Sequence, residues 1–146
     1  MKKIGMILCL VCMILMLVPI STSAQGAKDK SLTFDWNPVI NAIIQVESEG
    51  NAKAIDKSGK SCGIMQITPG HVRECNRILK LRKSKKRYEM NDRFSVSKSK
   101  EMFLLFQSFY NPKNSVEQAI RSWNGGMGYT KRGTQKYFEK VMSKMK

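Results

Sequence analysis

The spacing of apolar residues is the feature of this 146-residue chain that most limits the folds it can adopt. Ile40, Ile43 and Ile44 stand three and four positions apart, and Met102 and Phe106 repeat that spacing further along. Side chains with this period lie on one face of an α-helix, whereas strands need strict alternation, which is nearly absent here. The sequence therefore predicts an all-α domain with little or no β structure.

Capping residues and glycines divide this pattern into five expected helices. From the N-terminus, they are a helix capped by Asp35 or Asn37 and stopped by Gly50, one starting at Thr68-Pro69, one from about Ser97 to Tyr110, one capped by Asn114 or Ser115 and ended by Gly125 and Gly126, and one capped by Thr134. The inward side of the last helix is predicted to carry Tyr137, Phe138, Val141, Met142 and Met145.

The N-terminal residues have the composition of a secretion signal. Two lysines precede an uncharged apolar run, residues 4–20, and small residues follow up to Ala24, which is typical of a cleavable signal peptide. The run is just short of the length that a transmembrane anchor requires. We therefore expect residues 1–24 to be a signal peptide, 25–34 a flexible tail and 35–146 a single domain, with no stable membrane anchor after cleavage.

Positive charge dominates the chain, which has 26 Lys and Arg against 11 Asp and Glu and a formal net charge of +15. The densest run extends from Lys80 to Arg87, and its simplest interpretation is a solvated helix end or loop. Only Tyr88 adjoins the run as an aromatic, so base stacking is not indicated and no nucleic-acid partner is expected. In a secreted protein this charge favours long-range attraction to anionic polymers of the cell envelope.

Cys62 and Cys75 are the only cysteines outside the apolar N-terminal run. In an oxidising compartment they are a candidate disulfide, and two buried thiols are the alternative, because the 12 intervening residues permit either arrangement. These cysteines and the single His71 do not supply four metal ligands, so no metal site is expected. His71 itself is interpreted as a partly exposed helix residue.

Glu47 is the candidate for chemistry at the end of the first expected helix. It follows Ile43 by four positions and Ile44 by three, so a helix places its carboxylate on the face that turns toward the core. Burial raises the pKa of a carboxyl, which suits a proton donor near neutral pH. From this segment alone, a carboxylate that bends back to solvent is an equal alternative. Glu49, two positions on, is interpreted as solvated.

Three short motifs occur in one order around this acid. They are Glu47-Ser48 within residues 44–51, Gly63-x-x-Gln66 within residues 61–69, and Trp123-Asn-Gly-Gly within residues 119–126. With this combination the chain resembles the lytic transglycosylase domain of the lysozyme-like superfamily, over about 100 residues from Val39 to Val141. The resemblance implies a lysozyme-like fold, a single compact helical domain with a substrate groove.

The resemblance makes Glu47 the catalytic acid and assigns substrate contacts to nine further residues: Ser48, Gly63, Met65, Gln66, Trp123, Asn124, Gly125, Tyr129 and Tyr137. Gly63 lets a backbone approach closely, and Gln66 offers both a donor and an acceptor to a sugar. Structural alternatives stay open for four residues: helix capping for Ser48, core packing for Met65, a helix C-cap for Asn124 and packing on the core for Tyr129. Departures from the family pattern at Lys60, Ser61, Cys62 and Trp123 affect substrate preference more than reaction class.

Glycoside cleavage ordinarily uses two carboxylates, and only one well-placed acid occurs here. That fits the transglycosylase route implied by the resemblance, in which Glu47 serves first as acid and then as base and the product is a 1,6-anhydromuramoyl sugar. No cofactor is required. The expected partner is the glycan strand of peptidoglycan in the periplasm or cell wall. Small enzymes of this kind resemble those that open the wall for conjugation, secretion or phage systems.

Other function classes stay open at this stage. A hydrolytic muramidase of the same superfamily would need Asp56 or Asp92 to hold a water molecule. A non-catalytic peptidoglycan-binding component of an envelope secretion or conjugation apparatus would have no need of a desolvated Glu47. A cationic antimicrobial or surface-binding protein is supported by the net charge alone.

Overall fold

The computed structural model describes residues 34–145, so the predicted signal peptide and nearly all of the predicted tail lie outside the described residues. The described part is all-α, as predicted, with two isolated antiparallel bridges, Ile55 with Cys62 and Cys62 with Ile67. Its elements are α1 (Asn37–Ser48), α2 (Pro69–Leu81), the short 3-10 helix η1 (Met90–Phe94), α3 (Val96–Tyr110), α4 (Val116–Gly125) and α5 (Lys131–Met142).

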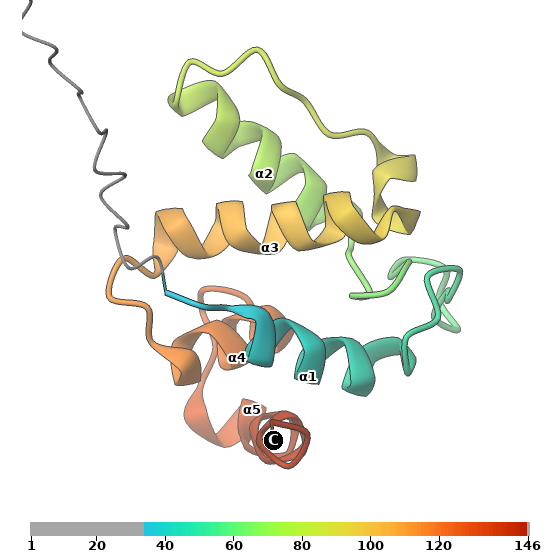
Figure 1. The fold of residues 1–146 in the computed structure, drawn as a ribbon, viewed down its shortest axis with the longest axis vertical. Coiled ribbons are helices and arrows are strands. Elements are labelled where there is room, and N and C mark those ends of the chain that lie inside the picture. Colours follow the sequence, from blue (N-terminus) through green and yellow to red (C-terminus); the bar gives the residue numbers. More distant parts are fainter. Residues whose placement is uncertain (1–33, 146) are drawn as a thin grey trace, which may run out of the picture. The chain divides into compact units, whose positions relative to one another are not determined.

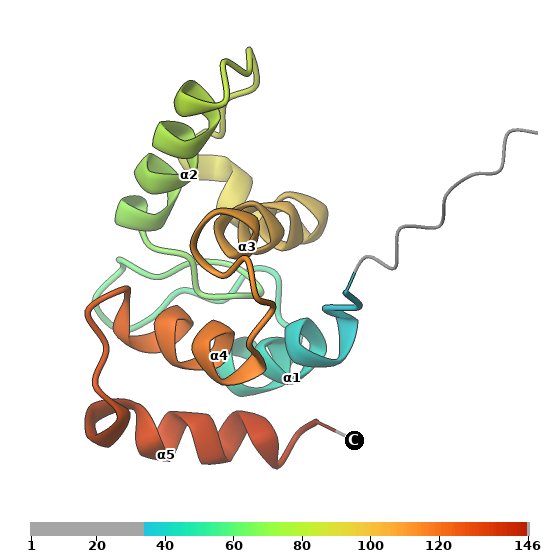
Figure 2. The same cartoon turned by 90° about the vertical axis from the view of Figure 1, so that its left-hand side faces the viewer.

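The helices form two groups (Figure 1). In one group α5 packs against α4 and α1, and in the other α2 and η1 pack against α3. The view in Figure 2 separates the two groups, with α2 and α3 on one side and α1, α4 and α5 on the other. The segment 49–68 runs from the end of α1 to the start of α2 and so connects the groups.

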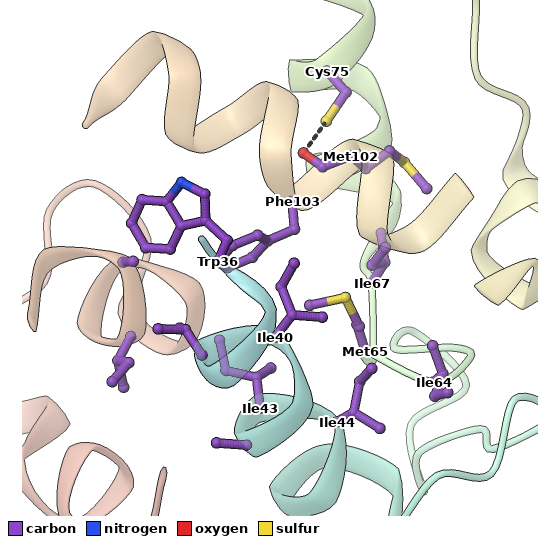
Figure 3. Close-up of a cluster of buried hydrophobic side chains, with 14 of the residues drawn as sticks. Trp36, Ile40, Ile43, Ile44, Ile64, Met65, Ile67, Cys75, Met102 and Phe103 are labelled. Atoms are coloured by element: carbon purple, nitrogen blue, oxygen red, sulfur yellow. Dashed lines mark hydrogen bonds between the residues drawn. The ribbon is translucent and has the colours of Figure 1, made fainter. Parts of the chain in front are cut away.

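One hydrophobic core holds both groups together (Figure 3). Ile40 and Ile43 of α1 lie with Met102 and Phe103 of α3 around Met65, which is fully buried in the 49–68 segment. Burial of each such side chain contributes about 1.5–3 kcal/mol to the free energy of folding. The isoleucine stripe predicted for the first helix therefore faces the core.

Serine and threonine hydroxyls cap four of the helices. The side chains of Thr68, Ser95, Ser115 and Thr130 each accept a hydrogen bond from the backbone N–H three residues on. The prediction that Thr134 caps the last helix is wrong, because Thr130 does so and Thr134 lies buried one turn inside α5. There the Thr134 hydroxyl donates to the Thr130 carbonyl at 2.8 Å.

Two further details of the helix pattern differ from the prediction. The N-cap of α1 is Trp36 rather than Asp35 or Asn37, and the buried Trp36 side chain makes no capping hydrogen bond. Asp35, one residue earlier, accepts a hydrogen bond from the Asn37 N–H at 2.9 Å. Met142, predicted to face inward, is 41% exposed in the last turn of α5. The neighbouring Val141 is fully buried there, so only that flank of the turn faces the core.

Cys62 and Cys75 are free, buried thiols, so they do not form the candidate disulfide, and the alternative of two buried thiols is confirmed. The Cys75 thiol donates to the Met102 carbonyl at 3.6 Å within the core. Burial raises the pKa of this thiol to about 12, so it stays protonated and packs as a small apolar group. Cys62 lies in the 49–68 segment, with its Sγ 4.0 Å from the Gly59 carbonyl oxygen.

The basic run from Lys80 to Arg87 forms the end of α2 and the loop after it, and its charged side chains are exposed. Lys86 pairs with Glu101 of α3, and Arg82 donates to the Ser108 hydroxyl at 3.1 Å. These contacts fit the interpretation of the run as a solvated helix end and loop. Every helix within residues 34–145 is too short or too polar to cross a membrane.

Candidate active site

A hollow of about 340 Å³ lies where α1, the 49–68 segment, α2 and α4 come together. Its lining residues are Glu47, Asp56, Ser61, Gln66, Ile67, Thr68, His71, Trp123 and Asn124. The lining includes residues from all three motifs that the sequence analysis singled out, although the motifs are far apart along the chain. The fold therefore gathers them at a single depression of the surface.

Glu47 occupies the last turn of α1 and is half-buried at this hollow. Burial is the largest influence on its carboxyl and raises the pKa, because it disfavours the charged form. A hydrogen bond from Tyr137 and the positive charge of Lys140 act in the opposite direction. The net direction is upward, which leaves more of the carboxyl protonated near neutral pH and suits a proton donor.

Tyr137 of α5 orients the Glu47 carboxyl. Its hydroxyl donates to Glu47 Oε1 at 2.6 Å, a contact between residues that are 90 positions apart in the chain. Burial and the negative charge of Glu47 both raise the pKa of the Tyr137 hydroxyl, so it remains protonated and available as a donor. The resemblance assigns Tyr137 to the substrate, whereas the structure engages its hydroxyl with the acid because α5 packs against α1.

The variant Tyr137→Phe is expected to lower the kcat/KM of cleavage roughly 10-fold, because the Glu47 carboxyl loses its fixed orientation. The hydrogen bond from Tyr137 favours the carboxylate, so its loss raises the pKa of Glu47 further. The alkaline limb of the pH profile of kcat/KM should therefore move to higher pH. Tyr129→Phe is the control, since Tyr129 does not line the hollow. An alkaline limb that stays in place or moves to lower pH would contradict this role.

The Gly63-x-x-Gln66 motif forms a tight turn at the edge of the hollow. Gly63 and Gln66 both have left-handed backbone conformations, with φ of 78° and 51°. The Gln66 side-chain amide donates to the carbonyls of Gly63 at 2.9 Å and Ala54 at 3.3 Å, so its nitrogen holds the turn. Its Oε1 accepts no hydrogen bond within residues 34–145, which leaves an acceptor for a ligand.

The close approach predicted at Gly63 is to the protein's own backbone. A Cβ on Gly63 would lie 1.7 Å from the Arg93 carbonyl oxygen, so only glycine lets the motif pack against the end of η1. The Arg93 side chain adds a hydrogen bond to the Lys60 carbonyl at 3.0 Å. Gly63 therefore positions the motif, and its contact with the substrate stays a prediction.

Two other residues predicted at the substrate have structural roles. Ser48 donates to the Ile64 carbonyl at 2.7 Å and so ties the end of α1 to the 49–68 segment, rather than bonding the Glu47 carboxyl. Met65 is fully buried, which realises the core-packing alternative. Its carbonyl accepts a hydrogen bond from the Trp123 indole N–H at 3.2 Å, so this backbone fixes the aromatic side of the hollow.

Trp123 forms an aromatic side of the hollow. Its ring centroid lies 4.6 Å from that of His71 and 5.2 Å from that of Phe103. Because its N–H is already bonded to a backbone carbonyl, the ring offers a sugar mainly apolar surface. Asn124 is exposed beside it and its side chain forms no hydrogen bond within residues 34–145. The C-cap of α4 is Gly126, so the Asn124 amide is left for a ligand.

Gly125 and Tyr129 serve packing. A Cβ on Gly125 would lie 2.8 Å from Thr134 Cγ2 and 2.8 Å from Tyr129 Cβ, so the glycine lets the end of α4 approach α5 and the loop before it. Neither Gly125 nor Tyr129 lines the hollow. The assignment of these two residues to the substrate stays a prediction, because no substrate contact of either residue follows from the lining of the hollow.

His71 is a site residue that the sequence analysis missed. It lines the hollow, and its ring packs against the rings of Trp123 and Phe106. Its Nε2 is buried without a hydrogen-bond partner among residues 34–145. Burial lowers its pKa to about 4, so the imidazole is neutral near pH 7. The sequence pattern that could have identified His71 is its position four residues before Cys75, which places it on the buried face of α2. No group of three or more potential metal ligands occurs within residues 34–145.

Only one of the two acids that a hydrolase could use, Asp56 and Asp92, lies at the hollow. Asp56 lines the hollow together with Glu47. Its two carboxylate oxygens accept hydrogen bonds from the Ser58 hydroxyl at 2.7 Å and the Ser61 N–H at 3.0 Å, and these bonds lower its pKa. Asp92 is not part of the hollow and instead accepts from the Glu89 N–H at the start of η1.

A second hollow of about 390 Å³ adjoins the first one, and we call the two together the groove. The two share Thr68, His71, Trp123 and Asn124 in their linings. Beyond these residues the second hollow has an aromatic side and a polar end formed by Phe106, Tyr110 and Glu74, in which the Tyr110 hydroxyl donates to Glu74 at 2.6 Å. Two adjoining hollows with aromatic and polar sides suit an extended polymer of sugars.

Comparison with known families agrees with this geometry. The family model described as Transglycosylase SLT domain matches residues 27–145, which include all of the described helices and the whole groove. The chain matches no curated protein and no solved structure at a significant level. Because the family match spans well over half of the sequence and the structure has the expected lysozyme-like helical fold, the chain belongs to the transglycosylase SLT domain family.

Proposed function

We propose that this protein is a peptidoglycan lytic transglycosylase that cleaves the β-1,4 bond between N-acetylmuramic acid and N-acetylglucosamine. Family membership supports a transglycosylase-type activity on peptidoglycan. The observation that carries the finer proposal is the half-buried Glu47, whose carboxyl Tyr137 holds within a groove. A protein that only bound glycan would gain nothing from a desolvated acid at that position, which argues against a non-catalytic scaffold.

In the first step, protonated Glu47 donates its proton to the glycosidic oxygen as the bond from the muramic C1 breaks. The bonding electrons leave with the oxygen of N-acetylglucosamine, and positive charge develops at C1. The acetamido group of the same muramic residue stabilises C1 in place of an enzyme carboxylate. The raised pKa of Glu47 suits this step, since the carboxyl must hold its proton in the substrate complex.

In the second step, Glu47 is a carboxylate and removes the proton from the 6-hydroxyl of the muramic residue. The hydroxyl oxygen then bonds to C1, which gives a 1,6-anhydro product without the addition of water. The Tyr137 hydrogen bond suits this stage, because it stabilises the charged carboxylate after the first proton transfer. The free acceptor of Gln66 and the free amide of Asn124 would bind the sugar, and Trp123 would pack against its apolar face.

The mass of the digestion products tests the proposed reaction. Purified peptidoglycan is incubated with the protein and the soluble fragments are analysed by mass spectrometry. A transglycosylase produces anhydromuramoyl ends, whereas a hydrolase produces reducing ends that are heavier by one water. Reducing ends as the main product would contradict the proposal in favour of hydrolysis.

The hydrolytic alternative stays relevant because Asp56 lines the hollow with Glu47. In a hydrolase Asp56 would orient the attacking water, so Asp56→Asn would reduce cleavage at least ~100-fold. In the proposed transglycosylase, Asp56 only holds the 56–61 loop through Ser58 and Ser61. We therefore expect Asp56→Asn to change the rate less than about fivefold and to leave the anhydro products unchanged. Ser58→Ala is the matched control, because it removes one of these loop hydrogen bonds and keeps the carboxylate.

We further propose that the protein acts outside the cytoplasm, in the periplasm or cell wall. The substrate is located there, and the expected signal peptide at residues 1–24 would direct export. An association with an envelope-spanning secretion or conjugation apparatus stays part of this proposal. Fusion of residues 1–30 to a reporter protein tests export, which the proposal expects. Retention of the reporter in the cytoplasm would contradict the proposed location.

A further inference from the structure

One flank of α5 carries an unpaired row of cations. Arg132, Lys136 and Lys140 stand four positions apart and are exposed, and we call them the α5 basic face. None of their side chains forms an ion pair or a hydrogen bond within residues 34–145. Lys131 differs, since it lies 3.4 Å from Glu117. The basic face is therefore available to an anion from outside the chain.

The geometry of the helix places this face beside the catalytic centre. Successive residues of an α-helix are about 100° apart, so Lys140 lies about 60°, Lys136 about 100° and Arg132 about 140° from Tyr137, all on the same side. The partly buried Phe138 lies on the other side of Tyr137 and packs against the core. Since the Tyr137 hydroxyl bonds to Glu47, the Lys140 end of the α5 basic face lies nearest the acid, although no residue of α5 lines either hollow.

The electrostatics of the neighbouring groups agree with this placement. The positive charge of Lys140 acts on the Glu47 carboxyl, so this end of the basic face lies within electrostatic range of the acid. The acid on the same helix, Glu139, borders the face about 60° from Lys136, but it accepts a hydrogen bond from Gln135 at 2.7 Å and forms no ion pair with the face. Within residues 34–145, no carboxylate forms an ion pair with the α5 basic face.

We propose that the α5 basic face binds the carboxylates of the peptides attached to muramic acid while the glycan occupies the groove. This inference rests on the proposed function, because a muramic residue cleaved at Glu47 must carry its lactyl-linked peptide past one side of the groove. Peptide carboxylates are the anions that are covalently joined to this substrate. The face would thus make the enzyme prefer glycan that still bears acidic peptides.

The proposal is tested with soluble, uncrosslinked peptidoglycan strands and the same strands after carbodiimide-mediated amidation of their carboxylates. The test variant is Arg132→Gln/Lys136→Gln, which leaves Lys140 and its effect on Glu47 in place. The matched control is Lys83→Gln/Lys85→Gln, which removes the same net charge from two exposed, unpaired residues after α2. Steady-state kinetics give kcat and KM for each protein on each substrate.

We expect the wild-type protein to have a lower KM for the native strands than for the amidated strands. The α5 variant should raise KM on native strands about fivefold, with kcat and the KM for amidated strands unchanged, because two exposed ion pairs are lost. The loop control should change KM much less. Equal KM values of the wild type on both substrates, or equal effects of the two variants, would overturn the proposal.

Two other outcomes are distinguishable. If the wild-type protein cleaves neither substrate, the proposed function fails, whereas cleavage of both with equal KM removes only this inference. Sedimentation with phosphatidylglycerol vesicles examines a membrane surface as the alternative anion. Loss of vesicle binding in the α5 variant, with discrimination between the two strand preparations unchanged, would assign the face to anionic lipid and overturn the proposal.

Discussion

Replacing Glu47 with glutamine is expected to lower the rate of glycan cleavage by at least ~100-fold and to leave the fold intact. The amide is nearly isosteric with the carboxyl, and its Oε1 can still accept the hydrogen bond from Tyr137. It has no proton to transfer near neutral pH, so both proposed steps lose their acid or base. Release of soluble fragments from peptidoglycan measures activity, and thermal unfolding followed by circular dichroism measures the fold.

Glu49→Gln is the matched control for this experiment. Glu49 is exposed at the C-cap of α1 and lines neither of the two hollows. The control therefore removes the same charge from the same helix end without touching the groove, and its activity should stay close to that of the wild type. An active Glu47→Gln protein would contradict the mechanism. Equal losses in both variants would mean that charge at the end of α1, rather than proton transfer, supports cleavage.

Replacing Gly63 with alanine is expected to reduce the free energy of unfolding by about 3 kcal/mol or more. Gly63 has a φ of 78°, which an L-residue adopts only at a cost of about 1–2 kcal/mol. The new Cβ would also lie 1.7 Å from the Arg93 carbonyl oxygen, a backbone atom that cannot rotate away. The turn of Gln66 must then shift, so cleavage should fall together with stability. Urea denaturation measures the free energy of unfolding.

Gly59→Ala is the control that separates the cost of the left-handed backbone conformation from the cost of the steric clash. Gly59 has a similar φ of 70°, but an added Cβ would meet no atom within 4 Å. Its substitution should therefore cost only about 1–2 kcal/mol. Similar losses at the two glycines would refute the claim that packing against Arg93 requires glycine at Gly63. A Gly63→Ala protein with wild-type stability would refute the strained turn as well.

The helical fold could be predicted from the sequence because burial of one helix face imposes a period that is visible in the chain. The stripe of Ile40, Ile43 and Ile44 is buried in α1 as that period required. The start of the last helix was harder to predict, since Thr130 and Thr134 are both competent caps. Tertiary contact decided between them, because Arg121 of α4 donates to the Thr134 hydroxyl at 3.1 Å and keeps it inside α5.

The candidate site was predicted in part. Glu47, Gln66, Trp123 and Asn124 line one hollow, and the resemblance of their motifs to the family was sufficient to group them. Ser48, Gly63, Met65 and Gly125 belong to the same motifs but support the site through backbone contacts and packing. A motif records which residues a site requires, and it does not distinguish residues that touch a ligand from those that shape the backbone around it.

By itself the sequence determined the helix class, the family and the candidate acid, because periodicity, capping chemistry and short motifs are local properties of a chain. Only the tertiary structure decided how that acid is held. The Tyr137 hydroxyl bonds to Glu47, although the two residues are 90 positions apart in the chain. Burial beside Phe106 and Trp123 lowers the pKa of His71 to about 4, so its imidazole is neutral near pH 7. Desolvation and hydrogen bonding depend on which distant segments pack around a group, and packing is a property of the whole fold.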